Sequence, residues 1–181
     1  QARADMLAKF AAITDERRRT YAAMVATVDE AVGRILTALE STGQRDRTLI
    51  FFLSDNGGPM TKRNANASVN SPLRGQKGDV FEGGLRVPFL ISWPARLPAG
   101  RTYTQPVISL DLLPTALAAA GATRDAKLAP LDGVDLLPFL TGQAAAAPHA
   151  RLFWRMDGGE AFAMREGNWK WLRTYQNAPQ L

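Results

Sequence analysis

The chain has 181 residues, of which 46% are hydrophobic and 22% are charged, and its formal net charge is +5. This length and apolar content are typical of a folded globular domain and exclude a disordered segment, while the absence of cysteine excludes disulfides and thiolate metal sites. Because no apolar run approaches the length of a membrane span and the basic residues are spread along the chain, we expect neither a transmembrane helix nor a nucleic-acid partner.

The first predicted element is a helix over residues 15–40. Thr14 or Asp15 is expected to cap its N-terminus, and Gly43 is expected to end it. Its apolar residues recur at steps of three and four, which places them on one face of a helix: Tyr21, Met24, Val25, Val28, Val32, Ile35, Leu36 and Leu39. We expect this stripe to be part of the core.

The next element is an unbroken apolar run over residues 49–53, which predicts a strand buried on both faces. It ends abruptly at residues 54–58, SDNGG. Sites in open α/β sheets lie just beyond the carboxyl ends of strands, and Asp55 and Asn56 there offer oxygen ligands to a hard cation. From the residues alone an alternative stays open, namely a strand-end turn in which Asp55 accepts hydrogen bonds from backbone N–H groups.

Two glycine-rich segments follow, LRGQKG at residues 73–78 and FEGGLRVP at residues 81–88. Glycines bracket Lys77, which suits an ammonium group held as a point charge against an anion. The alternative is a solvated loop lysine. Three charged neighbours either support this site or form structural pairs that hold the glycine-rich loop: Arg74, Glu82 and Arg86.

Downstream, residues 88–94, PFLISWP, predict a second buried strand. Residues 111–120 predict a helix that ends at Gly121, with Asp111 as its N-cap. Residues 131–140 predict a turn and a short helix.

Residues 141–148 are interpreted as a linker. The only histidine, His149, follows it and belongs to no catalytic constellation that the sequence reveals, so we do not expect it to act as an acid or base. Short strand candidates at residues 152–155, 161–165 and 169–173 are separated by turn signals and predict an antiparallel meander.

The motifs SDNGG, LRGQKG and FEGGLRVPFLISWP, in this order and spacing, resemble those of sulfatases of the alkaline-phosphatase-like superfamily. Three motifs in order are far more specific than any one of them. The resemblance implies an α/β fold: part of an alkaline-phosphatase-like sheet flanked by helices, followed by the start of a small antiparallel C-terminal sheet. It assigns residues 1–148 to the later part of the catalytic domain and residues 149–181 to an incomplete C-terminal subdomain.

The same resemblance implies a calcium-dependent hydrolase of sulfate esters. Asp55 and Asn56 would be metal ligands, and Lys77 would contact the sulfate group. The family's nucleophile is a formylglycine made from the first residue of a Cys/Ser-x-Pro-x-Arg motif. Residues 70–74 keep the Pro and the Arg, but Asn70 stands first and cannot supply that aldehyde. We therefore expect the nucleophile in an N-terminal part outside this chain, and no activity from the chain alone.

Two other functions stay open: hydrolysis of phosphate or phosphonate monoesters on the same superfamily fold, and a non-catalytic module that binds an anion or a metal. For a sulfatase, the expected partner is a sulfated small molecule or sugar, and a homo-oligomer is possible. The family resemblance leads us to expect a periplasmic, secreted or lysosomal location.

Overall fold

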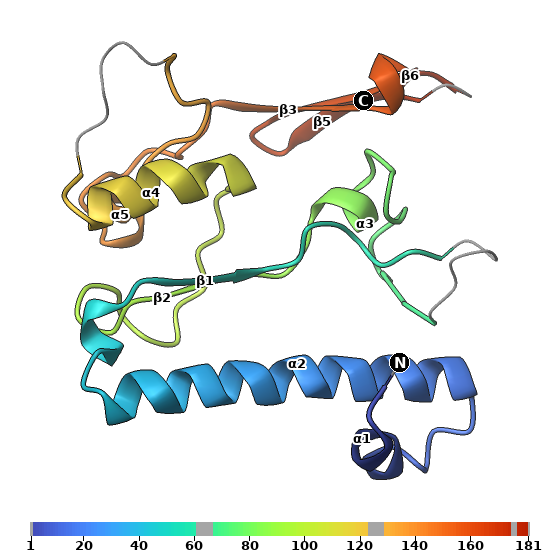
Figure 1. Ribbon diagram of the computed structural model, residues 1–181. Helices are drawn as coiled ribbons and strands as arrows, with labels where there is room; N and C mark the ends of the chain where they lie inside the picture. Colours follow the sequence, from blue (N-terminus) through green and yellow to red (C-terminus); the bar gives the residue numbers. More distant parts are fainter. Residues whose placement is uncertain (1, 61–66, 123–128, 175–176, 181) are drawn as a thin grey trace.

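The structure is a computed structural model that describes residues 2–60, 67–122, 129–174 and 177–180 (Figure 1). Its helices and strands follow one another in this order: α1 (Ala4–Lys9), α2 (Glu16–Ser41), η1 (Arg45–Arg47), β1 (Ile50–Leu53), α3 (Glu82–Leu85), β2 (Phe89–Ser92), η2 (Ser109–Asp111), α4 (Leu112–Ala119), α5 (Leu137–Leu140), β3 (Arg151–Met156), η3 (Asp157–Gly159), β4 (Ala161–Glu166), β5 (Trp169–Thr174) and β6 (Asn177–Gln180).

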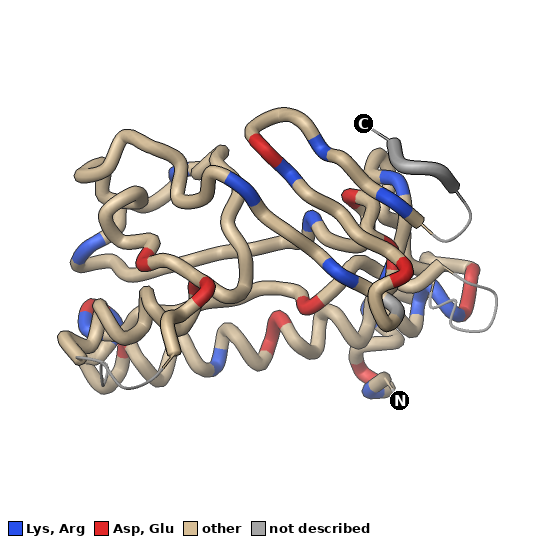
Figure 2. The backbone as a smooth tube through the Cα atoms, turned by 90° about the horizontal axis from the view of Figure 1, so that it is seen from above, with Lys and Arg blue, Asp and Glu red and all other residues tan. Residues whose placement is uncertain are grey.

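The elements form layers (Figure 1). The β1–β2 sheet runs between α2 on one side and α4 and α5 on the other, and the sheet of β3 to β6 lies beyond α3. Basic and acidic residues are interspersed along the described chain (Figure 2). Within the described residues, no helix combines the length and the apolar character that crossing a membrane requires.

Helix α2 confirms the predicted helix and both of its ends. The Asp15 side chain accepts a hydrogen bond from the backbone N–H of Arg18 at 2.7 Å, which is the N-cap contact. Gly43 follows the helix with a φ of +64°, a conformation that glycine adopts without steric cost. The N–H of Gln44 donates to the carbonyl of Leu39 at 2.8 Å, which is the bond that closes a Schellman motif.

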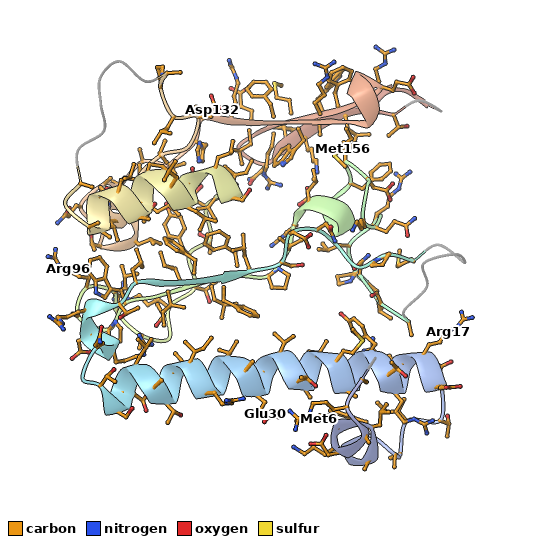
Figure 3. The ribbon with its side chains drawn as sticks, viewed as in Figure 1. Met6, Arg17, Glu30, Arg96, Asp132 and Met156 are labelled. Atoms are coloured by element: carbon orange, nitrogen blue, oxygen red, sulfur yellow. The ribbon has the colours of Figure 1, made fainter. Side chains whose placement is uncertain are left out.

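The prediction that the apolar stripe of α2 is buried is wrong for four of its residues. They are about half exposed: Met24 49%, Val25 50%, Val28 52% and Ile35 60%. The helix packs mainly on α1, where Met6 is buried and lies between the two helices (Figure 3), and on η1. Periodicity determines which face of a helix is apolar, whereas burial depends on a second layer, and the described residues cover this face only in part.

Strands β1 and β2 confirm the two predicted strands but not their predicted burial, which for the first strand was on both faces. They pair antiparallel, with Phe52 opposite Leu90. Partners across a pair project from the same face of a sheet, and here the two side chains are 45% and 57% exposed. Among the described residues each strand has one neighbour, so their apolar sequence has less cover than a central strand would have.

The predicted C-terminal meander is confirmed, with β3, β4 and β5 pairing in antiparallel order and β6 added at the edge. Its inner face carries the buried Ala161 and Ala163, which cluster with Val80. Partly buried apolar side chains pack around this cluster: Leu85, Trp154, Met156 and Leu172. The sheet therefore rests on the chain segment that includes the predicted FEGGL motif.

A charged bridge ties this sheet to α3. The Lys170 ammonium donates to Glu82 Oε1 at 2.6 Å, and the Arg165 guanidinium lies 3.4 Å from Glu82 Oε2. The three side chains are between 12% and 30% exposed, so solvent screens them less than it screens a surface pair.

By contrast, the ion pair of Arg151 on β3 and Glu166 on β4 lies at the surface, and both side chains are more than half exposed. Hydrogen bonds from Arg151, and then its charge, lower the pKa of the Glu166 carboxyl, but such a pair adds little stability.

Asp111 takes the predicted N-cap position of α4, but the predicted capping role is wrong, because its side chain makes no hydrogen bond to that helix. The carboxylate is fully buried and accepts hydrogen bonds from the N–H groups of Ile108 and Val134, each at 2.9 Å. His149 Nε2 lies 2.9 Å from both carboxylate oxygens. A buried carboxylate requires several hydrogen-bond partners. Here Ile108, Val134 and His149 provide them, and the first turn of α4 does not.

Thr115 extends this buried unit. Its hydroxyl donates to the carbonyl of Asp111 at 2.6 Å and accepts from the N–H of Leu136 at 2.9 Å. The start of α4 and residues 133–136 are thus one hydrogen-bonded unit, and His149, at the end of the predicted linker, is attached to it.

Candidate functional site

The three predicted motifs meet at four glycines, Gly57, Gly75, Gly83 and Gly84, which we call the glycine junction. The N–H of Gly57 donates to the carbonyl of Gly84 at 3.0 Å, and that of Gly83 donates to the carbonyl of Arg74 at 2.6 Å. A Cβ atom on Gly57 would overlap the carbonyl of Gly83, and one on Gly83 would overlap that of Gly75. The backbones of the motifs therefore lie in direct contact, at a separation that only glycine permits.

Asp55 and Asn56 lie on the turn that leaves β1. Ser54 fixes this turn, because its N–H donates to the carbonyl of Pro88 at 3.1 Å and its hydroxyl donates to the carbonyl of Asn56 at 2.8 Å. The Asn56 amide nitrogen donates to the carbonyl of Gly57 at 3.1 Å, which leaves the amide oxygen Oδ1 as an acceptor. Asp55 is exposed, and its carboxylate has no hydrogen-bond or ion-pair partner in the described part of the chain.

Lys77 lies on a tight turn beside the glycine junction. The N–H of Gln76 donates to the Asp79 carboxylate, and the N–H of Asp79 donates back to the carbonyl of Gln76, both at 2.9 Å. Lys77 is exposed between them, and its ammonium contacts no acceptor within the residues that the structure describes. The loop is thus anchored on both sides, while the charged group that it carries is free to bind an anion.

Of the three predicted supporting residues, two make structural contacts. The Arg74 guanidinium lies over the Phe81 ring, 3.9 Å from its centroid, in a cation–π contact. Glu82 forms the bridge to β4 and β5 already described. Arg86 is exposed, and its guanidinium has no partner among the residues described.

The donor set at Asp55 and Asn56 fits part of a site for a hard cation. A carboxylate and an amide oxygen are ligands that calcium prefers, and calcium takes about six to eight oxygens. Within the described ranges, no group of three or more His, Asp or Glu side chains could hold a metal. The two residues would therefore have to share the ion with other oxygens, such as backbone carbonyls and water.

Two residues that hold the site in place carry no local signal in the sequence. Asn70 appears there only as the unsuitable first residue of a nucleophile motif, yet its amide contacts both site loops. Lys170 is separated from Glu82 by 88 residues, and no spacing rule connects them. Homologous sequences that vary together at these positions are the signal that could have identified such contacts.

Comparison with known proteins gives a consistent result. A sequence model of the sulfatase family matches residues 1–122 of this chain. The chain is 41% identical to bovine arylsulfatase A over 146 residues, which are 79% of this chain and 28% of that protein. It is 33% identical to human N-acetylgalactosamine-6-sulfatase over 170 residues, which are 92% of this chain and 32% of that protein. The chain thus spans less than a third of the length of these curated relatives.

Solved structures are similar over nearly the whole chain. The structure of Ps i-CgsB in complex with k-i-k-neocarrahexaose is 38% identical, with a TM-score of 0.89, over 99% of this chain and 39% of that chain. PsFucS1 sulfatase from Pseudoalteromonas sp. is 27% identical, with a TM-score of 0.73, over 84% of this chain and 30% of that chain. The first likeness confirms the predicted α/β fold class with a small antiparallel sheet at its C-terminal end.

Proposed function

Because this chain belongs to the sulfatase family, we propose that it is the part of a sulfatase that offers Asp55 and Asn56 to a calcium ion and Lys77 to the sulfate group of a substrate. The observation that most supports this proposal is the glycine junction. It holds the turn of Asp55 and the loop of Lys77 against the same two glycines, Gly83 and Gly84.

The chemistry follows from the charges of these groups. Hydrolysis of a sulfate ester develops negative charge on the sulfate oxygens and on the leaving oxygen, and a bound cation would stabilise it as a Lewis acid. Lys77 would bind a sulfate oxygen through its ammonium donors. Because the turn and the loop are hydrogen-bonded before substrate arrives, little reorganisation is required on binding. A formylglycine nucleophile would come from a part of the protein outside these residues.

We assign the substrate class from the relatives. Ps i-CgsB, which resembles nearly all of this chain, has been solved with a neocarrahexaose, and one curated relative is named an N-acetylgalactosamine-6-sulfatase. A sulfated sugar is therefore the substrate that we propose, and a periplasmic, secreted or lysosomal location is the corresponding expectation.

Calcium titration of the 181-residue chain tests the metal part of this proposal. We expect Asp55→Ala to weaken calcium binding at least about tenfold, because the affinity of a calcium site depends on the number of its charged ligands. Asp132→Ala, which removes another exposed carboxylate, is the matched control and should leave the affinity unchanged. Equal affinities of Asp55→Ala and the unaltered chain would contradict the assignment.

The anion part is tested by titration with inorganic sulfate and by an activity assay. Lys77→Met should remove sulfate binding, whereas Lys9→Met, at another exposed lysine, should not. The unaltered chain alone should release no nitrophenol from 4-nitrophenyl sulfate, since it carries no nucleophile motif. Turnover by the purified chain, or sulfate binding that survives Lys77→Met, would refute this assignment.

A further inference from the structure

Asn70 joins the two loops of the candidate site through one side chain. Its Oδ1 accepts a hydrogen bond from the N–H of Gly58 at 3.0 Å, and its Nδ2 donates to the carbonyl of Gly58 at 2.8 Å. The second hydrogen of Nδ2 is directed to the carbonyl of Gly75, at 3.0 Å. The first two bonds hold the turn that carries Asp55, and the third holds the loop that carries Lys77.

We propose that Asn70 is a positioning residue, whose amide sets the separation between the turn of Asp55 and Asn56 and the loop of Lys77. The inference rests on the proposed function of those three residues. It adds a residue that touches neither metal nor sulfate but determines where their ligands lie.

The chemistry of the amide explains why asparagine occupies this position. A planar group with one acceptor and two donor hydrogens matches the N–H and C=O of Gly58 and the C=O of Gly75 together. Aspartate would turn a carboxylate oxygen, without a hydrogen, toward two carbonyl oxygens. Alanine would leave three backbone groups without their partner, and each lost bond costs about 1 kcal/mol.

The segment that carries Asn70 is itself held in place. The Arg18 guanidinium of α2 donates to the carbonyl of Ala67 at 2.8 Å. A second contact joins the same two loops, because the N–H of Met60 donates to the side-chain oxygen of Gln76 at 2.5 Å. The segment of Asn70 is therefore linked to α2 through Ala67, and the side chain of Asn70 links this segment to both loops of the site.

Two variants, Asn70→Asp and Asn70→Ala, test the proposal in the 181-residue chain. Asn168→Asp and Asn168→Ala, at an exposed asparagine in the β4–β5 turn, are the matched controls. Three quantities are measured at a temperature at which each variant is folded: the exchange rate of the Gly58 amide hydrogen, the dissociation constant for calcium, and that for inorganic sulfate. A purely structural residue would lower the melting temperature and leave the affinities of the folded protein unchanged.

We expect Gly58 exchange to be at least about tenfold faster in Asn70→Ala, the effect of about 1.4 kcal/mol of lost protection, whereas Asn70→Asp keeps an acceptor for this N–H and loses only the two bonds to carbonyl oxygens. Calcium and sulfate should each bind about tenfold more weakly, and the Asn168 variants should behave like the unaltered chain. Unchanged affinities in folded Asn70 variants overturn the proposal. If the unaltered chain binds neither ion, the proposed function fails, and the positioning role that rests on it fails too. An unchanged Gly58 exchange rate in Asn70→Ala overturns the positioning role in either case.

Discussion

Gly57→Ala is expected to lower the free energy of unfolding by about 3 kcal/mol and to abolish calcium binding. The new methyl group would overlap the carbonyl of Gly83, and the backbone there is already in contact with Gly75 and cannot retreat. Overpacking of this kind costs about 1–3 kcal/mol even where side chains can adjust. The N–H of Gly57 would also lose its bond to Gly84. Urea unfolding and calcium titration of the variant measure the two effects.

Gly33→Ala in α2 is the matched control. Nothing lies within 4 Å of the Cβ position there, and alanine favours a helix over glycine by about 0.5–1 kcal/mol. The same chemical change should therefore stabilise the chain slightly at residue 33 and disrupt it at residue 57. A Gly57→Ala protein with the stability and calcium affinity of the unaltered chain would show that the glycine junction is not as tight as the structure has it.

His149→Leu is expected to cost about 1–3 kcal/mol of stability, because it removes a hydrogen-bond partner from a buried carboxylate. The Asp111 carboxylate is fully buried, and the His149 side chain is 9% exposed. Without the imidazole, the carboxylate keeps two backbone donors among the described residues, the N–H groups of Ile108 and Val134. Chemical unfolding should show this loss, and Asp111→Asn in the His149→Leu background should recover part of it, because the buried carboxylate charge is then removed.

Arg151→Ala provides the comparison for a pair that is not buried. Its partner Glu166 is 53% exposed and solvent screens the pair, so the loss of stability should be much smaller than that of His149→Leu. If His149→Leu costs no more than Arg151→Ala, the contact between His149 and Asp111 contributes nothing beyond a surface pair.

What the sequence predicted was largely local. The cap at Asp15, the stop at Gly43 and the turns between β3, β4 and β5 all depend on neighbouring residues, and the structure confirms them. Helices α1 and α3 were not predicted, since both are short and α3 contains two glycines. The three sequence motifs also identified the segments that meet at the glycine junction. The metal and sulfate roles, and the domain boundary after residue 148, stay predictions.

The failures have a common physical origin in contacts that are remote along the chain. Asp111 has the sequence context of an N-cap, but one partner of its carboxylate, His149, is 38 residues away. The apolar stripe of α2 has the correct period, yet burial is a property of what lies opposite, and Ile35 is 60% exposed. Pattern rules describe a residue and its near neighbours, so they cannot report such contacts.

The bridge between Glu82 and β5 also bears on the order of events during synthesis. A ribosome adds residues from the N-terminus at about 5–20 per second, so the 88 residues from Glu82 to Lys170 take about 4 to 18 seconds to make. Throughout that interval the motifs of the glycine junction already exist in the nascent chain, while the complete sheet of β3 to β6, which packs against them, does not. The junction therefore cannot reach its final environment until β5 has left the exit tunnel.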